Sequence, residues 1–73
     1  MQRRFAAIIQ REGKWFVALC PELDVASQGE TIEEARGNLA EAIQLYLEVA
    51  SPQELAERDL GEIFVTQIEV PVA

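Results

Sequence analysis

Apolar residues recur at steps of three and four along residues 31–50, and this spacing predicts one long amphipathic helix. The apolar stripe consists of Ala35, Leu39, Ala42, Ile43, Tyr46, Leu47 and Ala50. Thr31 precedes the stripe as a candidate N-cap, and Glu34 three residues later completes the sequence of a capping box. Pro52 cannot continue a helix, so the helix is expected to end just before it. Such a helix needs a surface to cover with its stripe.

Four other stretches have the alternation, or the β-branched and aromatic composition, of strands. They are residues 4–10, 15–20, 25–28 and 63–70. Residues 11–14 form a polar break with Gly13 available for a positive φ, which predicts a hairpin turn between the first two strands. Residues 53–60 indicate a short second helix or helical loop. The order of elements predicts an α+β fold, a two-layer β-β-β-α-β sandwich whose mostly antiparallel sheet is covered by the long helix.

Both faces of the first two predicted strands carry apolar residues, whereas a strand with one face in water has polar residues at every second position. The helix can cover only one face. An apolar set on the other face would be exposed in a monomer, and such a patch usually marks an interface. The residues expected at this interface are Ala6, Ile8, Phe16 and Ala18. The pattern therefore predicts a homo-oligomer, a dimer or tetramer, formed through that face or through an exposed strand edge.

A chain of 73 residues makes a single domain, residues 1–73, and buries only about 60% of its unfolded surface. Chains of this size commonly supplement their core with disulfides, a metal or oligomerisation. Cys20 is the one cysteine and the sequence has no histidine, so a disulfide and a zinc site both lack partners. Oligomerisation remains. No apolar run approaches the ~18 residues of a membrane span, so we expect a cytoplasmic protein with no membrane contact.

The net charge is −7, from 13 acidic and 6 basic residues, and acids dominate after Trp15. An acidic surface repels phosphate backbones and attracts a basic protein, so direct DNA binding is not expected. The candidate partner-binding group flanks the loop and the start of the predicted helix: Glu22, Asp24, Glu30, Glu33 and Glu34. The alternative is that these acids only keep a small domain in solution.

Most catalytic arrangements lack a required part in this sequence. Without histidine, neither a Ser-His nor a Cys-His nucleophile pair can form. No Gly-rich phosphate-binding motif occurs, and the predicted strand centres carry no carboxylates for a metal-dependent nuclease. Cys20 is expected to be a small buried hydrophobe. We therefore expect no enzyme and no catalytic, cofactor-binding or metal-binding residues.

Two alternatives to a binding module remain open. One is a weak enzyme or small-ligand binder with a pocket at a subunit interface, such as a metal-dependent nuclease-like protein. The other is a stand-alone oligomeric domain without a specific partner.

A set of short motifs occurs in a fixed order in the middle of the chain. Trp15-Phe16-Val17-Ala18 is followed by Pro21-Glu22-Leu23, then by Ser27-Gln28-Gly29-Glu30-Thr31, then by Glu33-Glu34-Ala35 and Glu41-Ala42-Ile43-Gln44-Leu45-Tyr46-Leu47. With this order and spacing, residues 13–48 resemble the HicB antitoxin family. The resemblance implies a β-β-β-α-β domain like a degraded ribonuclease-H fold, oligomerisation, and occlusion of a small basic ribonuclease toxin in a type II toxin–antitoxin system.

The chain departs from the family pattern in two places. The family's Pro-Gly-Cys is replaced by Asp24-Val25-Ala26. Many members also carry a C-terminal DNA-binding domain, whereas this chain stops at Ala73, so we expect a short form that does not bind operator DNA. The first hypothesis is thus a non-catalytic, antitoxin-like protein whose acidic group faces toxin cations.

Overall fold

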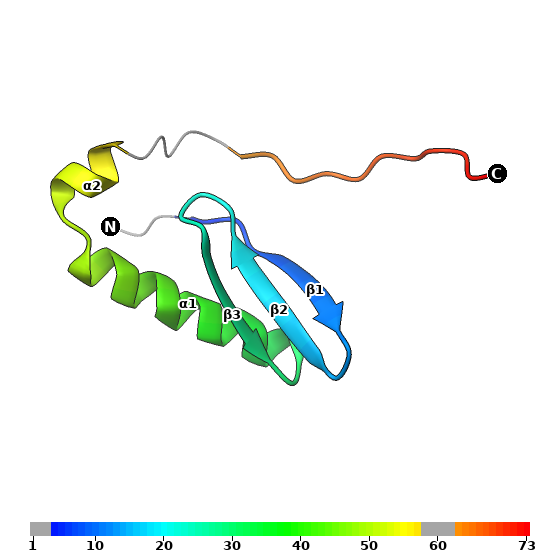
Figure 1. Cartoon of the computed structure of the whole chain (residues 1–73), viewed down its shortest axis with the longest axis horizontal. Helices are drawn as coiled ribbons and strands as arrows, with labels where there is room; N and C mark the ends of the chain where they lie inside the picture. The colour runs from blue at the N-terminus through cyan, green and yellow to red at the C-terminus, as the bar shows by residue number, and fades with distance from the viewer. Residues whose placement is uncertain (1–3, 58–62) are drawn as a thin grey trace.

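Three strands form one antiparallel sheet in the order β1-β2-β3 in the computed structural model, which describes residues 4–57 and 63–73 (Figure 1). They are β1 (Ile8–Glu12), β2 (Trp15–Cys20) and β3 (Val25–Gly29). The first hairpin closes through Gly13 at φ 60°, and the second turn contains Asp24 at φ 55°. Both values lie in the left-handed region, which glycine and aspartate tolerate better than most residues. The predicted hairpin is confirmed, although β1 begins at Ile8 and not at residue 4.

The long helix is α1 (Ile32–Val49), and its ends are those that the sequence predicts. The Thr31 hydroxyl accepts a hydrogen bond from the Glu34 N–H at 3.0 Å, which satisfies one of the unpaired donors of the first turn. At the other end the Ala50 N–H donates to the Tyr46 carbonyl at 2.9 Å. A short helix, α2 (Pro52–Glu57), follows, while the rest of the predicted stretch 53–60 lies outside the described residues.

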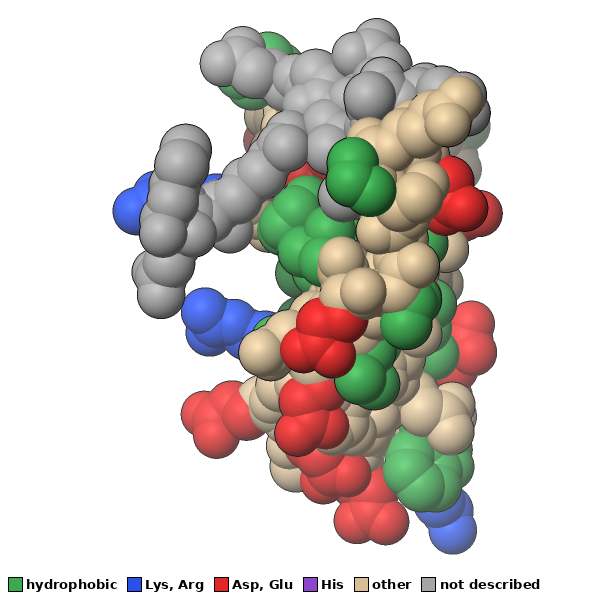
Figure 2. All heavy atoms as spheres, turned by 90° about the vertical axis from the view of Figure 1, so that its left-hand side faces the viewer, with side chains coloured by type: hydrophobic (Ala, Val, Ile, Leu, Met, Phe, Trp, Pro, Cys, Tyr) green, Lys and Arg blue, Asp and Glu red, His purple; other side chains and the backbone are tan. Residues whose placement is uncertain are grey.

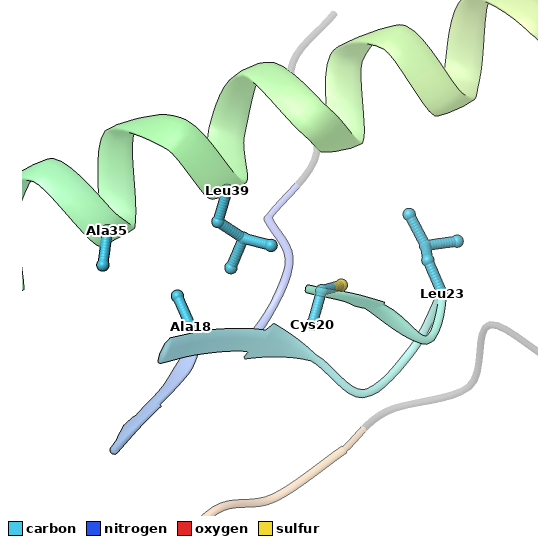
Figure 3. Packing of buried hydrophobic residues seen from close by; sticks show 5 residues of the cluster. All are labelled: Ala18, Cys20, Leu23, Ala35 and Leu39. Atoms are coloured by element: carbon cyan, nitrogen blue, oxygen red, sulfur yellow. The ribbon is translucent and has the colours of Figure 1, made fainter. Parts of the chain in front are cut away.

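The core lies between α1 and one face of the sheet (Figure 3). Its fully buried members are Ala18, Cys20, Leu23, Ala35 and Leu39. The helix approaches β3 so closely that a Cβ on Gly29 would lie 2.5 Å from the Ala35 backbone nitrogen. Gly29 is therefore required by this close packing.

The register of the hairpin decides which residues share a face. Glu12 pairs with Trp15 across the two-residue turn, so each even-numbered residue of β1 pairs with an odd-numbered residue of β2. Paired residues lie on the same face, which places Ile9 beside Ala18 and Ile8 beside Leu19.

This register corrects the interface set expected from the sequence. Ala18 is fully buried under α1, and Phe16 packs against the same core. Ile8 lies on the opposite face with 40% of its surface exposed, and Ala6 precedes β1 and is half-buried. The four residues therefore do not form one uncovered face. The large apolar residues that are exposed on the outer face of the sheet are Ile8 and Trp15.

The α+β class, with an antiparallel sheet covered by one long helix, is confirmed. The fourth strand expected at residues 63–70 is not formed: residues 63–73 have no regular secondary structure and are exposed along their whole length. A strand exists only when its backbone pairs with a neighbour, and this segment has no strand partner within the described chain. The observed order is β-β-β-α followed by the short α2.

Candidate protein-binding surface

The five acids expected to contact a partner lie at opposite ends of the sheet. Glu22 and Asp24 belong to the turn that enters β3, whereas Glu30, Glu33 and Glu34 follow the end of β3. Five residues of strand span roughly 17 Å at about 3.3 Å each, so the two groups cannot act as one cluster.

Glu22 has a structural role. The Ala6 N–H donates to both of its carboxylate oxygens, at 2.9 Å and 3.2 Å. The Cys20 Sγ lies 3.6 Å from the same carboxylate. Glu22 is half-buried and ties the segment before β1 to the turn after β2. These hydrogen bonds give Glu22 a role in the fold without any partner. Asp24, two residues later, is exposed and has a left-handed backbone conformation.

Glu30, Glu33 and Glu34 are exposed around the start of α1. Glu33 and Glu34 lie in the first turn, where the helix dipole favours negative charge. Their carboxylates therefore stabilise the helix and at the same time make this end of the molecule negative.

The solvent side of α1 continues this charge along the helix. Glu34, Glu41, Leu45 and Glu48 are separated by seven, four and three residues, which places them on one side of a helix with 3.6 residues per turn. All four are exposed, and Leu45 exposes 62% of its surface. Glu41, Gln44, Leu45 and Glu48 line a shallow hollow there. We call Glu34, Glu41, Gln44, Leu45 and Glu48 the acidic face.

The sequence pattern did not single out the acidic face. Of its residues, the sequence predicts a partner contact only for Glu34, whereas Glu41, Gln44 and Leu45 occur only within one of the family-like motifs. The helical spacing of Glu34, Glu41 and Glu48 around Leu45 was the signal that could have found it. Figure 2 shows acidic and hydrophobic side chains interspersed on the side of the molecule that carries α2.

Cys20 is buried in the core and not available for chemistry. Burial raises the pKa of its thiol above the usual 9.0, and the neighbouring Glu22 carboxylate raises it further. A thiol that stays protonated is a poor nucleophile. The expectation of a small buried hydrophobe is confirmed.

Residues 4–57 and 63–73 contain neither a cluster of metal ligands nor a helix that could span a membrane. No group of three or more cysteine, aspartate or glutamate side chains in this part of the chain is arranged to hold a metal ion. Neither α1 nor α2, the helices of these ranges, combines the length and apolar character needed to cross a bilayer.

Comparisons of the chain with protein-family models, with curated proteins and with solved structures find no match. Its function is therefore inferred from its own residues.

Proposed function

We propose that this chain is a non-catalytic protein-binding module that captures a small basic protein, in the manner of an antitoxin that occludes a basic ribonuclease toxin. The observation that carries the proposal is the acidic face, a row of exposed carboxylates around an exposed leucine on the solvent side of α1. The motifs of residues 13–48, which resemble those of HicB antitoxins, supply the type of partner.

The two components of the acidic face have different physical roles. Its carboxylates steer a cationic partner toward α1 and fix its orientation, because opposite charges attract before contact. Leu45 provides apolar area that becomes buried when the partner binds, and removing apolar area from water favours association. The net charge of −7 extends the attraction over the rest of the surface.

Occlusion requires no chemistry from this chain. A ribonuclease toxin holds RNA through cations, so a carboxylate surface that occupies those cations blocks the substrate. Of the acids expected from the sequence, Glu34 belongs to this surface, and Glu30 and Glu33 lie beside it at the start of α1. Glu22 is not part of this surface, because its carboxylate accepts a hydrogen bond from the Ala6 N–H.

The proposal is tested with two variants of equal net charge, one that loses charge on the acidic face and one that loses the same charge elsewhere. The test variant carries Glu34→Gln, Glu41→Gln and Glu48→Gln, and the control carries Glu12→Gln, Asp24→Asn and Glu54→Gln. Each removes three acids, so the net charge rises from −7 to −4 in both (−7 + 3). Binding to a small basic protein encoded beside this chain is measured by calorimetry at two salt concentrations.

The test variant is expected to bind about tenfold more weakly, since three surface charge pairs contribute roughly 0.5 kcal/mol each. Its affinity should also depend less on salt. The control should bind within about twofold of the unmodified chain at the same salt. Equal weakening of both variants would show that only the overall charge matters, and unchanged binding of the test variant would contradict the proposal.

A further inference from the structure

Residues 63–73 form an extended arm that leaves the domain after α2 (Figure 1, orange to red). We call it the C-terminal arm. Phe64, Ile68 and Val72 expose 83%, 82% and 93% of their surfaces. The radius of gyration is 14.4 Å, whereas a compact chain of this length has about 11 Å. The arm therefore carries its apolar side chains outward from the body of the molecule.

The sequence of the arm is that of a strand with one apolar side. Phe64, Thr66, Ile68 and Val70 alternate with Gln67 and Glu69 in its second half. In an extended chain these even-numbered residues point to one side. Burying Phe64, Ile68 and Val70 would stabilise the protein, because it would remove three large apolar side chains from water. The arm thus has both the shape and the apolar side of a missing fourth strand.

The sheet has two edges, and α1 packs nearest to the edge formed by β3. The helix packs mainly on β3 and β2, and the Asn38 side-chain amide donates to the Gln28 carbonyl of β3 at 2.8 Å. This bond occupies an acceptor that a strand added at β3 would need. The β3 edge is therefore a poor site for a further strand.

The β1 edge is open. Within the described chain β1 has β2 on one side and no strand on the other. An edge strand directs every second N–H and C=O away from its partner, and these groups bind another strand readily. Phe5 and Ile9 lie partly buried on the helix side of this edge, so a strand placed there would extend the existing core.

We propose that two copies of this chain exchange their C-terminal arms, with residues 63–70 of each copy pairing with β1 of the other as a fourth strand. The exchange pairs the free backbone groups of β1 and buries the apolar side chains of the arm in both copies. It closes with two-fold symmetry, so it produces a dimer and no longer assembly. This inference rests on the arm and the β1 edge and is independent of the acidic face and its partner.

The first test is the mass of the full chain in solution by light scattering. The chain should form a dimer of twice 8.2 kDa. Replacing Phe64 and Ile68 by aspartate should give a monomer, because the arm can no longer bury its apolar side.

The control carries Val49→Asp and Val72→Asp, two exposed apolar residues outside the pairing segment, and should remain a dimer. Far-ultraviolet circular dichroism should show α1 intact in all three. A monomeric unmodified chain, or a dimeric Phe64→Asp/Ile68→Asp variant, would overturn the proposal.

A second test distinguishes exchange from closure of the arm on its own β1. Isotope-labelled and unlabelled chains are unfolded, mixed and refolded, and nuclear Overhauser effects are recorded between labelled and unlabelled copies. Contacts between residues 63–70 of one copy and residues 8–12 of the other support the exchange. The same contacts found only within one copy would overturn it, and so would a dimer whose intermolecular contacts involve Trp15 and the outer sheet face.

Discussion

Glu22 is the side chain that joins two segments distant in sequence. Its carboxylate accepts from the Ala6 N–H at 2.9 Å, sixteen residues away, in a half-buried position. A backbone donor that loses such an acceptor costs about 1–3 kcal/mol of stability. Glu22→Ala is therefore expected to lower the free energy of unfolding in urea by that amount.

The matched control for Glu22 lies two residues along the same turn. Asp24 is exposed at φ 55°, a conformation that asparagine also tolerates, so Asp24→Asn should change the unfolding free energy by less than about 0.5 kcal/mol. Equal effects of the two substitutions would show that the bond to Ala6 does not hold the N-terminal segment.

Cys20 gives the fold a pH dependence on the alkaline side. Because its pKa is raised in the folded state, the buried thiol keeps its proton when the unfolded thiol has lost it. The stabilisation is fully present below the usual thiol pKa of 9.0 and is lost as the pH rises through the folded value. The melting temperature should thus fall more steeply above about pH 9 in the unmodified chain than in Cys20→Ala. Parallel curves for the two proteins would contradict this.

The contact between α1 and β3 is the element-scale feature on which the two layers depend. Gly29→Ala would place a Cβ 2.5 Å from the Ala35 nitrogen and 2.8 Å from the Glu34 carbonyl carbon. Backbone atoms of a packed helix cannot move aside without disturbing the helix. This overpacking should therefore lower the free energy of unfolding by about 1–3 kcal/mol, as measured by chemical unfolding.

A second glycine supplies the control. Gly37 lies within α1, and a Cβ there would meet nothing within 4 Å. Gly37→Ala should stabilise the chain by about 0.5–1 kcal/mol, because alanine is the better helix former. If both substitutions destabilise alike, the close approach of α1 to β3 is not as described.

The elements that could be predicted from the sequence are those whose limits are set locally. Thr31 and Pro52 define α1, and Gly13 and Pro21 bound β2. The grouping of Phe16 and Ala18 with Ile8 failed because a shared face depends on hairpin register, not on either strand alone. The strand at 63–70 failed for a related reason: its amino acids favour a strand, but pairing requires an edge that its own domain does not place beside it.

At the scale of the whole molecule, only part of the candidate site followed from the sequence. The excess of acids indicated a basic partner, and Glu34 was among the expected contacts. The division of Glu22 and Asp24 from the helix acids could not be predicted, because it depends on where the turns lie in the folded sheet. Leu45 could not be predicted as part of the acidic face, because its exposure among acids depends on which side of α1 faces the sheet.

The two proposed surfaces make different demands on the assembled molecule. The acidic face lies on the solvent side of α1, and the C-terminal arm is expected to pair with β1, which has few contacts with α1. A dimer built by exchange of the arm therefore leaves the acidic face of each copy free for a partner. Loss of the dimer in Phe64→Asp/Ile68→Asp should weaken partner capture less than charge removal on the acidic face, as measured by calorimetry.

Capture of a small basic protein is tested most directly by the mass of this chain in light scattering, alone and mixed with any small basic protein encoded beside it. The account predicts a stable complex heavier than the chain alone, which dissociates as salt is raised well above about 0.15 M. A mass that is unchanged by the basic protein at low salt would contradict the claim.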